Sequence, residues 1–377
     1  MGVLLCAGFV FATAPWAFAH GRSSDATNFR SAITDTPDIS GVRWQVYGGD
    51  EFLAVTNTSA TDLVVLGYED EPYLRVGPDG VFENALSPAA YINDDRLGTE
   101  VPAGVTVDPS AAPQWRRLSD GQQALWHDHR IHWMAPEPPR QTDGAVRPVE
   151  VYERWEVPVR YDGDLQLVVG TLTWVPAPNW LPWLALGLVL TVPAVLGLRS
   201  RPTPTPGPEP EQEAWPEQKA WPERWPEAAR PAAVVLGVVA LVNTTHLVDD
   251  LFAVPLPAGT LALAAVQTSL FIGIGLLGAY KGWQAGEGAF TALGVGAASI
   301  LVGQGLLYLP ALAASQTTSL LPDVWSRLLI SLSITQAVWV GLVAVVGSRA
   351  TMPELEERDD DRVAPQPGAP TSAPDTL

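Results

Sequence analysis

From about Pro178 onward, the sequence alternates long apolar blocks with short polar connectors. A helix of about 20 apolar residues is about 30 Å long, which matches the hydrocarbon core of a bilayer. The pattern therefore predicts an all-α membrane domain of five transmembrane helices, with the lipid bilayer as its first partner. The spans are expected at Trp180–Leu198, Ala232–Leu251, Ala258–Tyr280, Phe290–Leu312 and Leu328–Val346.

Residues 1–19 have the pattern of a secretory signal peptide. An apolar stretch is followed by Ala17-Phe18-Ala19, a small-x-small cleavage signal. The usual basic n-region is missing, so a retained anchor is the alternative. Cleavage after Ala19 would make His20 the new N-terminus, whose amine and imidazole together suit copper. Because the only cysteine, Cys6, lies in this leader, we expect the exported chain to have no disulfide and no thiolate metal site.

Between the leader and the first span lie short segments rich in β-branched and aromatic residues, separated by turn residues. About five to seven such segments, without a convincing helix, predict an all-β sandwich-like domain. Asp162-Gly163 indicates a hairpin between the last two segments. Long loops are expected between Pro78 and Gln123. The expected strands are Val42–Tyr47, Phe52–Thr56, Leu63–Leu66, Leu74–Val76, Leu125–Met134, Val149–Val159 and Leu165–Trp174.

Changes in composition set the domain boundaries. We expect the β domain at 20–177 and the first span at 178–199. A linker rich in Pro, Glu and Trp follows at 200–231, and it is expected to be extended and cytoplasmic. Spans two to five occupy 232–347, and 348–377 is expected to be a disordered acidic cytoplasmic tail. The positive-inside rule places the β domain outside the cell, because most basic connector residues fall on the opposite side: Arg199, Arg201, Arg224, Arg230, Lys281 and Arg349.

Two motifs in the polar half are distinctive. They are GYEDEPYLRVGPDGV from Gly67 to Val81 and WHDHRIHWM from Trp126 to Met134. Together they resemble an uncharacterised family of exported, membrane-anchored proteins from high-GC Gram-positive bacteria. The resemblance covers only the outer domain and implies an architecture rather than a chemistry. The layout alone, a histidine after a leader, a small sandwich and then membrane spans, is also similar to periplasmic copper-resistance binding proteins.

The second motif carries three histidines within six residues: His127, His129 and His132. On a strand, residues two apart share a face, so His127 and His129 would point together, and His132 would point away unless a bulge intervenes. Such a pair is suited to copper or zinc, and His20 or a carboxylate could complete the site. The sequence therefore offers these four histidines as metal ligands.

The same segment also allows a structural interpretation. Asp128 and Arg130 could pair in the interior, with the imidazoles bonded to main-chain carbonyl groups. The flanking Trp126 and Trp133 favour a buried segment. The sequence contains no Ser-centred elbow, glycine-rich phosphate loop or His-Glu-x-x-His helix. We therefore do not predict an enzyme.

The second span contains ionisable residues. His246, Asp249 and Asp250 follow one another at i, i+3 and i+4, which places them on one helical face in the outer half of the membrane. Ionisable groups at that depth are costly and suggest a function. With Gln304 of the fourth span they could form a polar pocket for an ion or a proton. Alternatively, the two aspartates lie at the interface and cap the span.

The net charge of −19 argues against a nucleic-acid partner, because phosphate binding needs clustered Lys and Arg. The leading hypothesis is a membrane-anchored extracytoplasmic binding protein, for copper or another transition metal. One rival is a structural or assembly protein of the cell envelope whose β domain binds another protein. A second rival is a small transporter, which five spans without a visible inverted repeat favour less.

Overall fold

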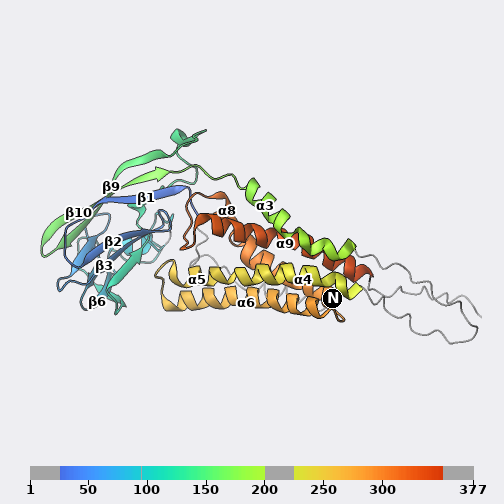
Figure 1. Ribbon diagram of the computed structural model, residues 1–377. Helices are drawn as coiled ribbons and strands as arrows, with labels where there is room; N and C mark the ends of the chain where they lie inside the picture. The colour runs from blue at the N-terminus through green and yellow to red at the C-terminus, as the bar shows by residue number, and fades with distance from the viewer. Residues whose placement is uncertain (1–25, 95, 200–224, 351–377) are drawn as a thin grey trace, which may run out of the picture.

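The computed structural model describes residues 26–94, 96–199 and 225–350. Within them, a β-rich domain of two antiparallel sheets is followed by a helical region with five long apolar helices, which confirms the predicted fold class. Figure 1 shows the β domain at one end of the helical bundle. The leader at 1–19, His20, most of the predicted linker and the tail from 351 onward lie outside the described residues.

The β domain is built from a larger and a smaller sheet, and all neighbouring strands are antiparallel. The smaller sheet has the order β2 (Val42–Tyr47), β3 (Phe52–Asn57) and β8 (Gln123–Trp126). The larger sheet has the order β1 (Phe29–Asp35), β10 (Asp164–Trp174), β9 (Val149–Tyr161), β4 (Leu63–Leu66), β5 (Pro72–Gly77), β6 (Gly80–Asn84) and β7 (Trp115–Ser119).

Alternation of apolar and polar residues directs one face of each main strand into the core. In β9, Trp155, Val157 and Val159 are buried, whereas Arg154 before them and Glu156 between the first two are exposed. Full burial of a large aliphatic side chain contributes about 1.5–3 kcal/mol. The same core receives fully buried side chains from both sheets, among them Leu53, Val55, Leu63, Val65, Val76, Val168 and Leu172.

The predicted hairpin between β9 and β10 is confirmed. Tyr161 pairs with Asp164, and the two residues between them, Asp162 and Gly163, have φ angles of 51° and 88°. Two consecutive positive φ angles are required by the type I′ turn, whose twist matches that of antiparallel strands. The Asp-Gly pair is therefore the local reason for this long hairpin.

The described part of the β domain has ten strands rather than the five to seven expected. A long loop is present between Pro78 and Gln123 as expected, at 93–94 and 96–114, although the stretch also contains β6, β7 and the short helix α2 (Ala89–Ile92). One predicted strand is wrong. The predicted strand Leu125–Met134 ends at Trp126, and a 3₁₀ helix, η1 (His129–Ile131), follows. The physical reason is Asp128, whose carboxylate accepts a hydrogen bond from the Arg130 backbone N–H and so caps that helix turn. A second 3₁₀ turn, η2, covers Arg140–Thr142.

Five helices are long and apolar enough to cross a membrane: Leu181–Leu198, Ala228–Phe252, Ala258–Gln284, Ala289–Leu306 and Asp323–Arg349. Many of their large apolar side chains are exposed, for example Val189 and Val266, as lipid contact requires. The helices that form the bundle are α3 (Leu181–Thr191) with its 3₁₀ continuation η3 (Val192–Arg199), α4 (Trp225–Val242), α5 (Thr244–Phe252), α6 (Ala258–Gln284), α7 (Ala289–Ile300), η4 (Leu301–Leu306), α8 (Leu309–Ala313) and α9 (Asp323–Ala350).

Two of the spans are irregular. The second is divided into α4 and α5 at Asn243, whose side-chain amide donates to the Val239 carbonyl oxygen at 2.8 Å. Such a bond from a side chain competes with the helical backbone pattern. The fourth span ends in η4, a π-helical segment, which is a rare feature often found at functional sites. Helix α4 also begins inside the predicted linker and includes Pro231.

Gly170 in β10 has no room for a side chain. A Cβ atom there would overlap the Trp155 indole ring and the Ala32 carbonyl oxygen of the neighbouring strand. We expect Gly170→Ala to destabilise the β domain by about 1–3 kcal/mol, as overpacking does. Denaturant unfolding of the full chain in detergent, followed by tryptophan fluorescence, measures this loss. Gly121→Ala is the matched control, because the nearest atom to its Cβ is a movable serine hydroxyl, and an equal loss in both variants would contradict the prediction.

Candidate functional site

The structure brings the rings of His127, His129 and His132 together where β8 leaves the smaller sheet. The His132 ring centroid lies 6.1 Å from that of His127 and 6.2 Å from that of His129. The expectation that His132 would point to the opposite face is therefore wrong, because η1 turns the chain that was predicted to be a strand. We call these three residues the histidine cluster.

The rings of the histidine cluster differ in their surroundings. His127 Nδ1 lies 2.9 Å from the Glu51 carbonyl oxygen, and its ring packs on Phe52 at 4.2 Å between centroids. His132 is fully buried, and neither of its ring nitrogens has a hydrogen-bond partner among the described residues. A buried polar group without a hydrogen bond is unusual and calls for a physical explanation.

Asp50 is the carboxylate that faces His132. Its Oδ2 lies 3.7 Å from His132 Nδ1, and its Oδ1 accepts a hydrogen bond from Arg96 at 2.7 Å. Burial lowers the pKa of His132 by more than the nearby Asp50 raises it, and the charge of Arg96 lowers it further. His132 is therefore a neutral imidazole at neutral pH, which is the protonation state that binds metal ions.

The predicted metal centre is not preformed. Among the residues that the structure describes, no group of three or more His, Cys, Asp or Glu side chains is placed to hold a metal ion. His20, the remaining predicted ligand, lies outside those residues. The structure thus gathers three imidazoles and one carboxylate without arranging them as a coordination shell.

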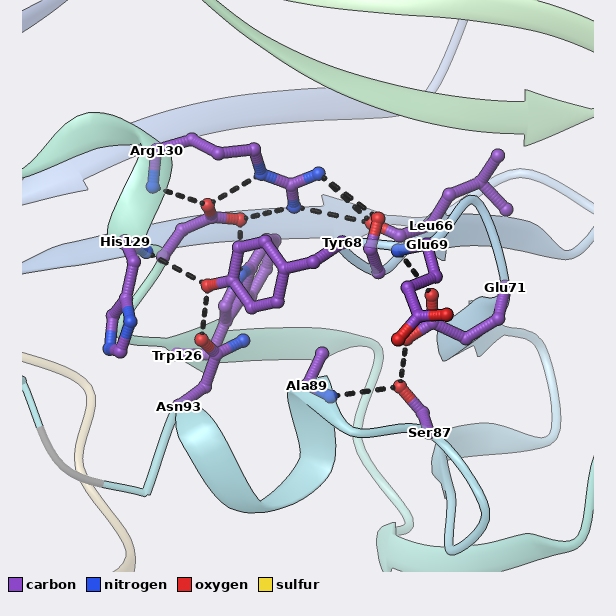
Figure 2. A network of polar contacts seen from close by, with 12 residues as sticks. Leu66, Tyr68, Glu69, Glu71, Ser87, Ala89, Asn93, Trp126, His129 and Arg130 are labelled. Atoms are coloured by element: carbon purple, nitrogen blue, oxygen red, sulfur yellow. Dashed lines mark hydrogen bonds and ion pairs between the residues drawn. The ribbon is translucent and has the colours of Figure 1, made fainter. Parts of the chain in front are cut away.

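Asp128 forms the ion pair that the structural interpretation of the motif predicted. It is fully buried and accepts hydrogen bonds from Arg130 Nη2 at 2.7 Å, Arg130 Nε at 2.8 Å and Trp126 Nε1 at 2.9 Å. Arg130 in turn donates to the Leu66 carbonyl oxygen at 3.2 Å (Figure 2). Burial raises the pKa of Asp128, but the charge and hydrogen bonds of Arg130 outweigh it, so this pKa lies below its usual value.

Tyr68 joins this ion pair to the histidine cluster. Its hydroxyl donates to Asn93 Oδ1 and accepts from the His129 backbone N–H at 3.0 Å (Figure 2). Burial, and the charge of Asp128 beside it, raise the pKa of Tyr68, so that the phenol stays protonated. The first and second sequence motifs therefore meet in one polar network around Asp128.

The four polar residues predicted inside the membrane have different contacts. Asp250 accepts hydrogen bonds from Thr268 at 2.5 Å and from Tyr308 at 2.9 Å, and the Tyr308 ring stacks on His246 at 4.5 Å. Gln304 is fully buried in η4, and neither atom of its amide has a hydrogen-bond partner among the described residues. His246 and Asp250 thus meet around Tyr308, and no hydrogen bond joins Gln304 to them.

Asp249 points elsewhere, to residues 314–322 between α8 and α9, which we call the docking loop. The Asp249 carboxylate accepts hydrogen bonds from the Leu320 backbone N–H at 2.8 Å and from the Ser319 hydroxyl. At its other end, the docking loop pairs with the β domain. Gln316 and Thr27 exchange two backbone hydrogen bonds, of 2.9 and 3.1 Å.

Sequence reasoning missed several residues that complete these sites. Asp50 stands in Gly48-Gly49-Asp50-Glu51, a turn between two predicted strands, and its approach to His132 depends on the fold of η1. Arg96, Tyr308 and the docking loop carry no motif that could have identified them. The histidines and the Asp128–Arg130 pair were visible in the sequence, because they are near neighbours in one segment flanked by tryptophans.

Comparison with protein-family models, curated proteins and solved structures finds no match to this chain. Its function therefore has to be inferred from the geometry of its own residues. The β domain contributes a cluster of imidazoles beside a buried carboxylate, and the helical bundle contributes a buried aspartate that holds a loop.

We expect Asp128→Asn to destabilise the β domain by about 3–5 kcal/mol at neutral pH, because it leaves the Arg130 charge buried without its partner. Since the pKa of Asp128 is lowered by folding, this difference should persist above about pH 3.9 and shrink as the pH falls further. Denaturant unfolding at several pH values measures it. The control Asp120→Asn removes an exposed partner of Arg117 and should cost at most about 1 kcal/mol.

His132 should make the stability of the β domain depend on mildly acidic pH. Folding lowers the pKa of His132, so below about pH 6.5 this imidazole binds a proton in the unfolded chain before it does so in the folded chain. Stability should then fall with decreasing pH, by up to about 1.4 kcal/mol per pH unit from this group. His132→Gln should flatten this slope, whereas His127→Gln should retain it. Equal slopes in the two variants would contradict the assignment.

Proposed function

We propose that the chain is a membrane-anchored binding protein whose β domain lies on the extracytoplasmic side and takes up a transition-metal ion, such as copper, at the histidine cluster. The bundle anchors the domain in the bilayer. Basic connector residues on the side opposite the β domain support this orientation through the positive-inside rule.

The observation that carries the proposal is His132. A fully buried, neutral imidazole with two unbonded nitrogens lies within 6.2 Å, between ring centroids, of two further imidazoles. Neutral imidazole nitrogens are common ligands of copper and zinc. An ion held there would bond to a ring nitrogen that has no hydrogen bond among the described residues.

Binding requires the imidazoles to turn. A metal–nitrogen bond is about 2.0–2.1 Å long, so the donor nitrogens must face one common point. His127 can keep the 2.9 Å contact of its Nδ1 with the Glu51 carbonyl oxygen and offer Nε2 to the ion, and Asp50 already faces His132. His20 would add an amine and a fourth imidazole if the leader is removed after Ala19. The proposed site therefore forms on binding.

Titration of the purified full-length chain with Cu(II) and Zn(II), by calorimetry and by metal analysis after gel filtration, tests the proposal. The wild-type chain should retain an ion, and His127→Gln combined with His129→Gln should lower its affinity about tenfold or more, which corresponds to about 1.4 kcal/mol. The matched control is His246→Gln, which removes the single histidine of the described bundle and should leave the affinity unchanged.

If a folded wild-type chain retains no ion above background, the metal-binding function is wrong. The second candidate, an assembly protein of the cell envelope, would then be favoured. The ion pair of Asp128 and Arg130 supports it, because this pair and Tyr68 fix the loops around both sequence motifs from inside the domain. In an assembly protein, the histidines would be structural residues that stabilise the β domain.

A further inference from the structure

The docking loop touches the β domain over several elements. Besides the backbone pairing of Gln316 with Thr27, the Ser315 backbone N–H donates to Asn28 Oδ1 at 2.9 Å, and the Ser315 hydroxyl donates to the Val175 carbonyl oxygen at 3.1 Å. These bonds reach both the segment before β1 and the segment after β10. The loop is therefore hydrogen-bonded to the two segments with which the β domain begins and ends in the sequence.

The same loop packs on the turn that serves the histidine cluster. A Cβ atom added to Gly49 would lie 2.9 Å from Gln316 Cβ, and one added to Gly48 would lie 3.0 Å from the Thr318 hydroxyl oxygen. The next residues of this turn are Asp50, which faces His132, and Glu51, whose carbonyl oxygen contacts His127. Only one turn of chain separates the histidine cluster from the docking loop.

The other side of the docking loop is fixed to the second span. Asp249 is buried, and its two carboxylate oxygens accept from Leu320 and Ser319. A buried carboxylate without its hydrogen bonds is strongly disfavoured, so Asp249 and the loop constrain each other. At the start of the loop, Arg327 of α9 donates to the Ala314 carbonyl oxygen at 3.0 Å.

We propose that the docking loop couples the histidine cluster to the second membrane span, with Asp249 as the anchor on the membrane side. A movement of the Gly48–Glu51 turn, on which both Asp50 and the contact to His127 depend, displaces the loop and with it the hydrogen bonds of Asp249. The role of Asp249 as an anchor follows from the hydrogen bonds of the docking loop, whereas the link to metal binding rests on the proposed function.

Thr27 and Gln316 provide a reporter of docking. Antiparallel residues that exchange two backbone hydrogen bonds have Cα atoms about 5.5 Å apart, within the range that a disulfide can bridge. With Cys6→Ser, the variant carrying Thr27→Cys and Gln316→Cys has no other cysteine. The rate of disulfide formation with diamide in intact membranes then measures how closely the loop holds the β domain.

Asp249→Ala in this reporter should slow disulfide formation about tenfold or more, because both acceptors of the loop are lost. Asp249→Asn keeps one carbonyl acceptor and should have an intermediate effect, and Ser319→Ala should reproduce part of the loss without removing a charge. The matched control is Asp250→Ala, whose hydrogen bonds go to Thr268 and Tyr308 instead. Equal rates in Asp249→Ala and the parent reporter would overturn the anchor.

The link to the histidine cluster is tested without added cysteines. If the two sites are coupled, loosening the loop at Asp249 should also change metal binding at the histidine cluster. Asp249→Ala should therefore change the Zn(II) affinity of the chain about fivefold or more, although Asp249 touches no histidine of the cluster. The control Asp250→Ala should leave this affinity unchanged. Unchanged affinity would overturn the coupling. Absence of Zn(II) binding in the wild-type chain would instead contradict the proposed function and, with it, the link to the histidine cluster. The disulfide rates would still decide whether Asp249 anchors the loop.

Discussion

The arrangement of the two domains depends on the Asp249 carboxylate, which holds the docking loop against the second span. Its two oxygens accept from the Leu320 backbone N–H and the Ser319 hydroxyl. A carboxylate buried among apolar residues is tolerated when hydrogen bonds satisfy it, and a loop adjoining membrane helices needs partners for its backbone. Each therefore meets the requirement of the other, and the loop so fixed carries the β-domain contacts of Gln316.

Inside the β domain, a second buried carboxylate also fixes a loop through its hydrogen bonds. Asp128 ends a predicted strand by capping η1, and its ion pair with Arg130 holds the carbonyl group of Leu66 at the end of β4. The same change of direction brings His132 to the other two imidazoles and to Asp50. The turn capped by Asp128 thus contributes both to the structural network and to the candidate binding site, which Tyr68 joins through the His129 backbone N–H.

The sequence predicted those parts of the fold that depend on local pattern. Hydropathy located the five spans, and alternation with the Asp162-Gly163 turn located β9 and β10. β6 was missed although Pro78-Asp79-Gly80 marks a turn before it, and the charged β7 has weak strand character. The course of the chain after Trp126 could not be predicted from alternation, because an aspartate cap competes with strand pairing there. Contacts of the docking loop join residues almost 300 positions apart, such as Asn28 and Ser315, and no local pattern encodes them.

Hydrogen–deuterium exchange of the docking loop in the full-length chain tests the central claim most directly. The backbone N–H groups of Ser315, Gln316 and Leu320 all donate hydrogen bonds, to Asn28, Thr27 and Asp249. If the loop holds the β domain to the bundle, these amides should exchange as slowly as those of the domain's paired strands, and Asp249→Ala should release all three together. Exchange at the rate of an unstructured peptide in the wild-type chain would contradict the account.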